Sequence, residues 1–322
     1  MTTPGAGPWR GHLFGLDLEG HFPAPGLDQL RGRSSGRRST LRRVPLAALD
    51  EWPTEQAGVL YERNLAGARF AIEWDEKLGF LLDHDHFGRF HVTIDGAAVA
   101  CAPRDMPDWH WQRFLVGQVL PLTAMLQGLE PFHASAVEID SQAVLCLGSS
   151  GAGKSSVALH LADRGAALVA DDVVALEVCH REVLAHPSPA LASIDADELD
   201  RFRPSGPVRD WLRLGSLDGE IRLAGPGDTK GPLSAGAMYA LAHRREARVV
   251  SIRAIGDERP AVLLGATFNS YYRASRRVGR HLDLCGHLAM TVPLFRVDVP
   301  PERGAADVAE AIERHVLAAP HR

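Results

Sequence analysis

Cysteine is scarce in this sequence, and its spacing excludes several kinds of site. The 322 residues include four cysteines, and no two of them form a C-x-x-C pair: Cys101, Cys146, Cys179 and Cys285. This pattern indicates neither a zinc site nor a disulfide framework. Residues 1–10 lack the apolar stretch of a signal peptide, and no run approaches the 18 apolar residues of a transmembrane helix. We therefore expect a protein of the reducing cytoplasm with no membrane partner.

A strong charge imbalance is also missing. The chain has 35 Lys and Arg against 40 Asp and Glu, which gives a formal net charge of −5. General nucleic-acid binders carry a basic excess, so we expect no nucleic-acid partner. With 45% hydrophobic and 23% charged residues, the composition is that of a soluble globular protein. The length suffices for one large domain or two ordinary ones.

The hydrophobic pattern changes character near residue 108. Before it, apolar segments separated by turn residues read as strands at 69–74, 78–82 and 91–94. From 108 to 128 apolar residues recur close to every 3.6 positions, which predicts a helix that Pro121 could kink. We therefore expect a smaller β-rich N-terminal domain over residues 1–108 and an α/β domain over residues 109–322.

The second domain begins with a predicted hairpin that leads into a buried strand. Its two strands are expected at 133–138 and 143–147, and a helix at 154–162 follows a glycine-rich turn. The remaining elements are expected as strands at 167–170, 173–178, 247–255, 261–264 and 294–299, and as helices at 271–290 and 305–318.

The glycine-rich turn matches a phosphate-binding loop in full. The pattern G-x-x-x-x-G-K-[ST] is filled, with a further serine after it, by Gly148, Ser149, Ser150, Gly151, Ala152, Gly153, Lys154, Ser155 and Ser156. Glycines allow successive N–H groups to face phosphate oxygens, and the N-terminus of the following helix favours negative charge. Lys154 can bind the β- and γ-phosphates, and Ser155 offers a hydroxyl to Mg²⁺. The sequence therefore predicts ATP and Mg²⁺ as cofactors.

Two carboxylates follow the loop after one short helix. The apolar run 168–170 ends in Asp171 and Asp172, and Asp172 comes 17 residues after Ser155. We expect the strands on either side of that helix to be near neighbours in a parallel sheet, which places both acids beside the loop. One carboxylate can bind Mg²⁺ and the other can accept the proton of an attacking hydroxyl. Adjacent strand residues point to opposite faces, so equal roles are not expected.

These residues resemble the HPr kinase/phosphorylase family. Its phosphate loop is followed by Arg-Gly and a Val-Ala-Asp-Asp strand end, found here as Arg164-Gly165 and as residues 169–172, and a histidine precedes the loop, as His133 does. The resemblance is specific over residues 131–178. It implies an α/β fold with an HPr-kinase-like P-loop domain, in which Asp172 is the catalytic acid/base, Asp171 supports the metal or the base, His133 lies near the transferred phosphate and Lys154 binds it.

The sequence resembles true HPr kinase less closely than it resembles the HPr-kinase-related proteins encoded beside bacterial peptide-biosynthesis genes. That subgroup shares the segment His-Ala-Ser-Ala-Val, here residues 133–137, and often a later lysine, where Lys230 stands. Some members phosphorylate a serine of a precursor peptide, as in certain lasso-peptide pathways. The resemblance thus implies a peptide or protein substrate and a homo-oligomer.

Two other functions are compatible with the same residues. The machinery fits any bound alcohol, so a small-molecule kinase is one alternative, and a nucleotide-binding sensor or scaffold without transfer is another. True HPr kinase also has a Glu-Ile-Arg-Gly-type segment that gives a metal ligand and an arginine. Residues 220–222 resemble it, but they lie much further from Asp172 than the family spacing, so we expect neither HPr as substrate nor the reverse phosphorylase reaction.

Overall fold

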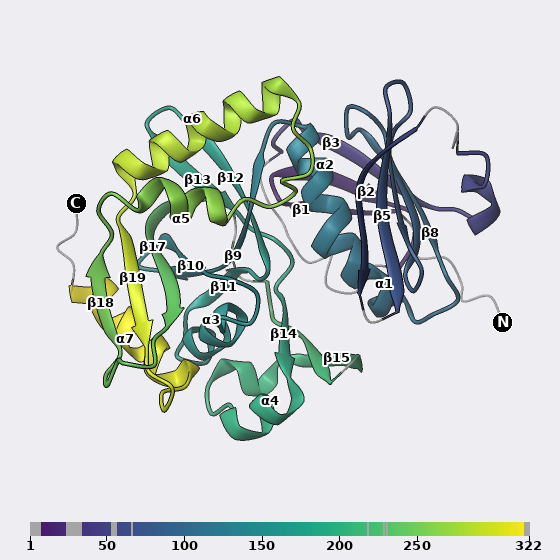
Figure 1. Cartoon of the computed structure of the whole chain (residues 1–322). Coiled ribbons are helices and arrows are strands. Elements are labelled where there is room, and N and C mark those ends of the chain that lie inside the picture. Colours follow the sequence, from purple (N-terminus) through teal and green to yellow (C-terminus); the bar gives the residue numbers. More distant parts are fainter. Residues whose placement is uncertain are drawn as a thin grey trace. The chain divides into compact units, whose positions relative to one another are not determined.

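The chain forms two compact units in a computed structural model (Figure 1). The structure describes residues 8–23, 34–52, 57–65, 67–217, 219–227, 229 and 231–318. Unit 1 comprises Met1–Leu129 and Asn269–Arg277, and unit 2 comprises Glu130–Phe268 and Val278–Arg322. The division thus follows Leu129, whereas we expected it after residue 108.

An eight-stranded sheet forms the body of unit 1, in the order β1-β2-β3-β8-β7-β6-β5-β4. Neighbours are antiparallel except for the parallel pairs β2–β3 and β3–β8. The unit also contains the short 3₁₀ helix η1 (Leu46–Leu49). The strands are β1 (Trp9–Leu13), β2 (Leu16–Gly20), β3 (Arg38–Arg43), β4 (Gly58–Leu65), β5 (Ala68–Asp75), β6 (Gly79–His84), β7 (Gly88–Val92) and β8 (Ala98–Pro103).

The helix predicted over residues 108–128 is present but belongs to unit 1. It consists of α1 (Asp108–Phe114), a π-helical segment η2 (Leu115–Val119) and α2 (Leu120–Leu126). The disturbance expected at Pro121 takes the form of the π-helical turn before α2, where a residue without an N–H is tolerated. The Trp111 side chain is fully buried, with its ring 5.2 Å from that of Phe22. This packing explains why the division falls after the helix and not before it.

A second segment of unit 1 comes from much later in the chain. In the stretch 269–277, the Tyr271 ring lies 5.7 Å from that of Tyr61 on β4, and the Tyr272 ring lies 5.2 Å from that of Phe80 on β6. Two aromatic contacts thus attach this stretch to the sheet of unit 1.

Unit 2 is built around one strand, β9 (Glu130–Ile139), that pairs with three others. It is antiparallel to β10 (Gln142–Leu147), to β11 (Ala167–Ala170) and to β12 (Val173–Cys179). The sheet continues from β12 through β13 (Glu182–His186), β17 (Leu233–His243), β19 (Leu294–Val299) and β18 (Ser251–Ala254). Because β17 also pairs with β10, the strands β10, β9, β12, β13 and β17 form a closed ring of pairings.

The sequence predicted that β10 and β11 are near neighbours in a parallel sheet, and this prediction is wrong in one respect. Both are antiparallel to β9 and so run in the same direction, but β9 lies between them. The reason is the predicted hairpin: Asp140 and Ser141 adopt φ values of 53° and 61°, the left-handed conformation of a tight two-residue turn. The turn folds β9 back along β10, and β9 thereby takes the place expected for β11.

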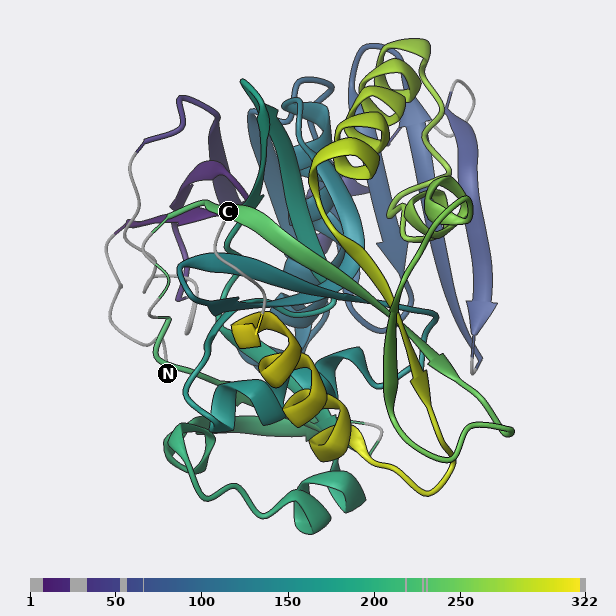
Figure 2. The same cartoon turned by 90° about the vertical axis from the view of Figure 1, so that its left-hand side faces the viewer.

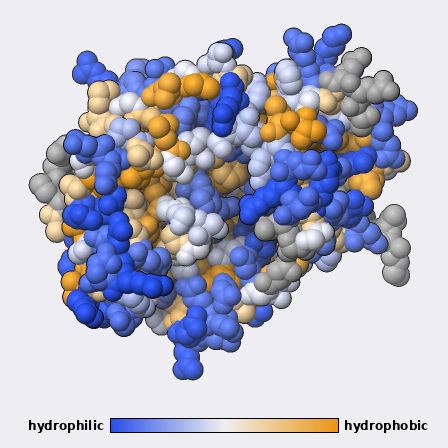
Figure 3. Space-filling model, viewed as in Figure 1, coloured by the Kyte–Doolittle hydropathy of each residue, from blue (hydrophilic) through white to orange (hydrophobic). Residues whose placement is uncertain are grey.

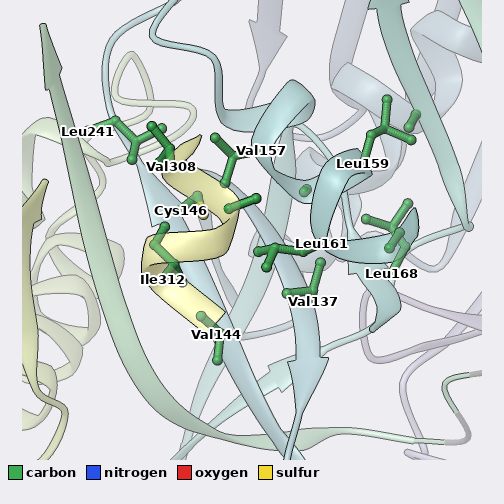
Figure 4. Close-up of a cluster of buried hydrophobic side chains, with 14 of the residues drawn as sticks. Val137, Val144, Cys146, Val157, Leu159, Leu161, Leu168, Leu241, Val308 and Ile312 are labelled. Carbon is green, nitrogen blue, oxygen red and sulfur yellow. The ribbon is translucent and has the colours of Figure 1, made fainter. Parts of the chain in front are cut away.

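Helices cover both faces of this sheet (Figure 2). Side chains of β10 alternate between two buried clusters, with Val144 and Cys146 in one and Leu145 and Leu147 in the other. Helices α3 (Lys154–Asp163) and α7 (Ala305–Ala318) contribute to the first cluster, which Figure 4 shows. Helices α5 (Arg259–Gly265) and α6 (Ser275–Thr291) contribute to the second. The sheet is therefore buried on both faces.

Most of the later elements agree with the sequence, and one does not. The expected helices at 271–290 and 305–318 and the strand at 294–299 correspond to α6, α7 and β19. The stretch 261–264, expected as a strand, lies in helix α5, which starts with a proline in its first turn. A short apolar run is compatible with either structure, so periodicity alone could not decide.

A small antiparallel sheet completes unit 2. Its strand order is β14 (Leu191–Asp195), β16 (Glu220–Ala224) and β15 (Leu212–Leu217), accompanied by α4 (Ala196–Phe202) and the 3₁₀ helix η3 (Pro207–Asp210). Polar and apolar residues are interspersed over the surface in Figure 3. Within the described part of the chain, no helix is long and apolar enough to cross a membrane.

Leu159 provides a test of the α3 core. Its side chain is fully buried in the first cluster, so Leu159→Ala removes packed apolar atoms and leaves a cavity. We expect a loss of about 2–5 kcal/mol in the free energy of unfolding, measured by denaturant titration. Leu317→Ala is the matched control, because Leu317 on α7 is 61% exposed. Equal losses in the two variants would contradict the assigned packing.

Candidate functional site

The loop between β10 and α3 has the backbone shape that its glycines predict. Gly148, Gly151 and Gly153 have φ values of 153°, 77° and 87°. A Cβ atom at Gly148 would lie 2.9 Å from the Cβ of Ala152, so a larger residue would distort the loop. Gly153 is the N-cap of α3 and has no side chain to bond the amides of the first turn. The helix thus begins with N–H groups suited to an anion.

Lys154 is the first residue of α3, and its ammonium group is enclosed by the protein. The residue is 6% exposed. Its Nζ donates to the carbonyl oxygens of Gly148 and Ser149, both at 3.1 Å, and to Nε2 of His133 at 3.0 Å. Burial lowers the pKa of Lys154, against the opposing effect of the nearby carboxylates of Asp172 and Asp171. The lysine therefore joins the loop to β9.

His133 lies on β9 between Lys154 and Asp172. Its Nδ1 is 3.1 Å from the carbonyl oxygen of Asp172 and 3.3 Å from the carboxylate oxygen Oδ1 of the same residue. An ammonium only donates hydrogen bonds, so Nε2 is the acceptor. Nδ1 therefore carries the ring proton and donates a hydrogen bond to Asp172. The backbone of His133 is fixed as well, since its N–H donates to the carbonyl of Ala266 at 2.7 Å. The predicted histidine is thus in contact with both the predicted lysine and the predicted acid.

Asp172 occupies the turn between β11 and β12 in a left-handed conformation with φ of 69°. Aspartate tolerates this region better than most residues, and such conformations are concentrated at functional sites. Its side chain is 53% exposed. Desolvation, the largest single effect, raises the pKa of Asp172, but the hydrogen bond from His133 and the positive charges of Lys154 and Arg222 outweigh it and lower the pKa. Asp172 is therefore an ionised carboxylate that can be reached from outside.

Asp171 has the opposite surroundings. The residue is 8% exposed, and its two carboxylate oxygens accept hydrogen bonds from Ser135 Oγ at 2.7 Å and from the Ser193 N–H at 3.3 Å. Burial raises the pKa of Asp171 and the charge of Asp172 adds to this, while hydrogen bonds from Ser135 and Ser155 act against it. The two neighbouring acids thus differ in exposure and in the direction of their pKa shifts.

Arg222 belongs to the segment 220–222, whose long distance in sequence from Asp172 argued against a place in the site. It lies on β16, and its Nη1 donates to Ser193 Oγ at 2.8 Å, on the residue whose N–H bonds Asp171. Its positive charge lowers the pKa of both acids. The long spacing from Asp172 is bridged because β14 and β16 pair with Ser193 opposite Arg222. The Glu-Ile-Arg pattern at residues 220–222 pointed to this arginine in the sequence. The pairing of β14 with β16, which brings Arg222 near the acids, is visible only in the structure.

Most of the other predicted residues belong to the glycine loop or follow it directly. Ser149, Ser150 and Gly151 are exposed at the outside of the loop, and Ala152 and Ser156 are buried beneath it. Ser155, next to Lys154, hydrogen-bonds to Asp171 and so lies beside the buried carboxylate. Lys230 lies outside the described residues.

Comparison with known proteins finds relatives over this part of the chain. Residues 125–194 match the family model of the HPr Serine kinase C-terminal domain, and they include β9, the loop, α3 and both acids. Residues 125–194 are HPr-kinase-like. The HPr kinase/phosphorylase of Halalkalibacterium halodurans is 44% identical over 78 residues, which is 24% of this chain and 23% of that protein. The HPr kinase/phosphorylase of Chlorobium phaeobacteroides is 51% identical over 53 residues, which is 16% of each protein.

The HPr-kinase-like segment is short compared with its relatives. The chain spans less than a quarter of the length of these two proteins. A solved structure, that of the Hpr(Ser) kinase/phosphatase from Coxiella burnetii, covers 58% of this chain and 97% of its own at 16% identity, with a TM-score of 0.30. That score supports no conclusion about a shared fold. The family resemblance expected from residues 131–178 is confirmed, and it rests on the segment 125–194.

The buried Asp171 gives a pH-dependent prediction. Its folded pKa lies above the ordinary value of 3.8, so the group adds stability below about pH 4 and this contribution is lost as the pH rises through the folded pKa. At neutral pH the buried carboxylate therefore destabilises the fold. We expect Asp171→Asn to raise the unfolding temperature by a few degrees at pH 7 in the presence of EDTA.

The difference should shrink as the pH falls toward 4, because a growing fraction of the wild-type side chain is then protonated and uncharged. Thermal unfolding monitored by circular dichroism between pH 4 and 8 measures this. The exposed Asp283→Asn on α6 is the control and should show no such trend. A wild type more stable than Asp171→Asn at pH 7 would disprove the destabilising role of the carboxylate.

Proposed function

We propose that this chain is an ATP-dependent kinase that transfers the γ-phosphoryl group to a hydroxyl, most specifically to a serine of a peptide or protein. The observation that carries the proposal is the hydrogen-bonded series Lys154–His133–Asp172 at the glycine loop. It joins a phosphate-binding cation to an ionised and accessible carboxylate, which are the two groups that phosphoryl transfer to an alcohol requires. A site that only held phosphate would need the first of these and not the second.

In this proposal the loop binds the phosphates of ATP. The N–H groups at the start of α3 and the Lys154 ammonium face the β- and γ-phosphates and stabilise the charge that develops on them. The loop residues proposed to bind the nucleotide are those from Gly148 to Ser156. Asp172, which its lowered pKa keeps ionised, accepts the proton of the attacking hydroxyl, and His133 orients it.

The donor set suits a magnesium ion. Ser155 offers a hydroxyl oxygen and Asp171 a carboxylate, and oxygen ligands are those that Mg²⁺ prefers. Burial raises the pKa of Asp171, so a cation beside it would offset the desolvation of its charge. Bound to these residues and to the phosphates, Mg²⁺ would neutralise charge on the γ-phosphoryl group. Ser135 and the Ser193 N–H hold the Asp171 carboxylate in a fixed orientation for this role.

The acceptor is the least constrained part of the proposal. The matching family model is that of a serine kinase domain, which favours a serine hydroxyl on a protein or peptide. A precursor peptide, implied by the resemblance to the peptide-biosynthesis subgroup, stays a prediction, as does a homo-oligomer. A small-molecule kinase uses the same residues with another alcohol, and a nucleotide sensor uses the loop without Asp172.

The decisive experiment follows the γ-phosphoryl group of labelled ATP in the presence of Mg²⁺. We expect label on a hydroxyl of one member of a pool of serine-containing peptides, proteins and small alcohols. Asp172→Ala should lower the transfer rate by about 10²–10⁴-fold, which is the usual contribution of a general base. ATP affinity, measured by calorimetry, should change little because Asp172 does not belong to the loop.

Lys154→Ala is the complementary variant, since it removes the phosphate-binding cation and should weaken ATP binding itself. Label on a peptide serine identifies a peptide kinase, and label on a metabolite identifies the first alternative. ATP binding without transfer by the wild type across the pool would favour the sensor and overturn the kinase.

A further inference from the structure

The ammonium group of Lys154 already has all of its hydrogen bonds within the protein. Its three acceptors are the carbonyls of Gly148 and Ser149 and Nε2 of His133, at 3.1, 3.1 and 3.0 Å. An ammonium has three N–H donors, so these partners saturate it. A phosphate oxygen that binds Lys154 must therefore replace one of them.

His133 is the partner that a phosphate can replace at the smallest structural change. The two carbonyls belong to the loop that carries Lys154, five and six residues before it, so their position is coupled to that of the lysine. His133 lies on a different element, β9, and its side chain is 29% exposed. It also keeps a second anchor, because Nδ1–H remains bonded to Asp172 when Nε2 loses its donor.

We propose that His133 competes with the nucleotide phosphate for Lys154 and thereby sets the affinity of the loop for ATP. The inference rests on the proposed function and concerns the binding step that precedes transfer. Lys154 turns from Nε2 of His133 to the phosphate, while the imidazole stays on Asp172. His133 is thus a positioning residue for Lys154.

The remaining partners of Lys154 determine what happens when this competitor is removed. In a His133→Ala variant the ammonium keeps the carbonyls of Gly148 and Ser149 as acceptors but loses the one that Nε2 of His133 provided. One of its N–H groups is then without its present acceptor. Such a donor is available to a phosphate without an exchange.

The proposal predicts a gain in affinity for Mg-ATP, whereas loss of a residue that binds the nucleotide would lower that affinity. Titration calorimetry with Mg-ATP on the full chain at neutral pH should show that His133→Ala binds about tenfold more tightly than wild type, the factor expected for one hydrogen bond to a charged group. His133→Gln can place an amide oxygen near the position of Nε2 and should return the affinity toward the wild-type value. His287→Ala, on α6, controls for the loss of an imidazole and should bind as wild type does.

Each outcome separates the inference from the function on which it rests. Unchanged or weaker binding by a His133→Ala protein with a normal unfolding temperature contradicts the competition and leaves the kinase standing. If that variant does not fold, His133→Phe fills the space without an acceptor and is judged by the same measure. Failure of the wild type to bind Mg-ATP overturns the proposed function, and the inference with it.

Discussion

Strand β9 pairs with β10 along its C-terminal part and with β12 along its N-terminal part, and the site depends on this arrangement. One strand thereby lies between the chain that enters the glycine loop and the chain that follows the two acids. His133 and Ser135, two residues apart on β9, reach toward Asp172 and Asp171. The strand pairing thus holds His133 and Ser135 beside the two acids, and His133 links Lys154 to Asp172.

Much of the site could be predicted from sequence because its residues are close together in the chain. The loop pattern, the short helix and the acid pair occupy one continuous stretch, and each residue type follows from phosphate chemistry. The sequence also predicted the hairpin that positions β9. It did not predict that β9 would separate β10 from β11, since the pairing partner of a buried strand leaves no trace in its periodicity.

Arg222 and the division between the units could not be predicted for a related reason. Each depends on contacts between residues distant in sequence. Arg222 is brought near the acids by the pairing of β14 with β16, and the helix from Asp108 is assigned to unit 1 by aromatic packing around Trp111. Local propensity carries no record of either contact. The stretch 261–264 failed for a different reason, because its apolar pattern was too short to distinguish a strand from a helix.

The stretch from Asn269 to Arg277 has a consequence for the modularity of the protein. The chain leaves unit 2 after Phe268, contributes Tyr271 and Tyr272 to the sheet of unit 1, and returns at Val278. A gene fragment that ends at Leu129 therefore encodes an incomplete unit 1, and the remaining fragment carries two tyrosines without the rings that they contact. Unit 1 therefore cannot be produced or transplanted as one contiguous segment of the chain without losing these two contacts.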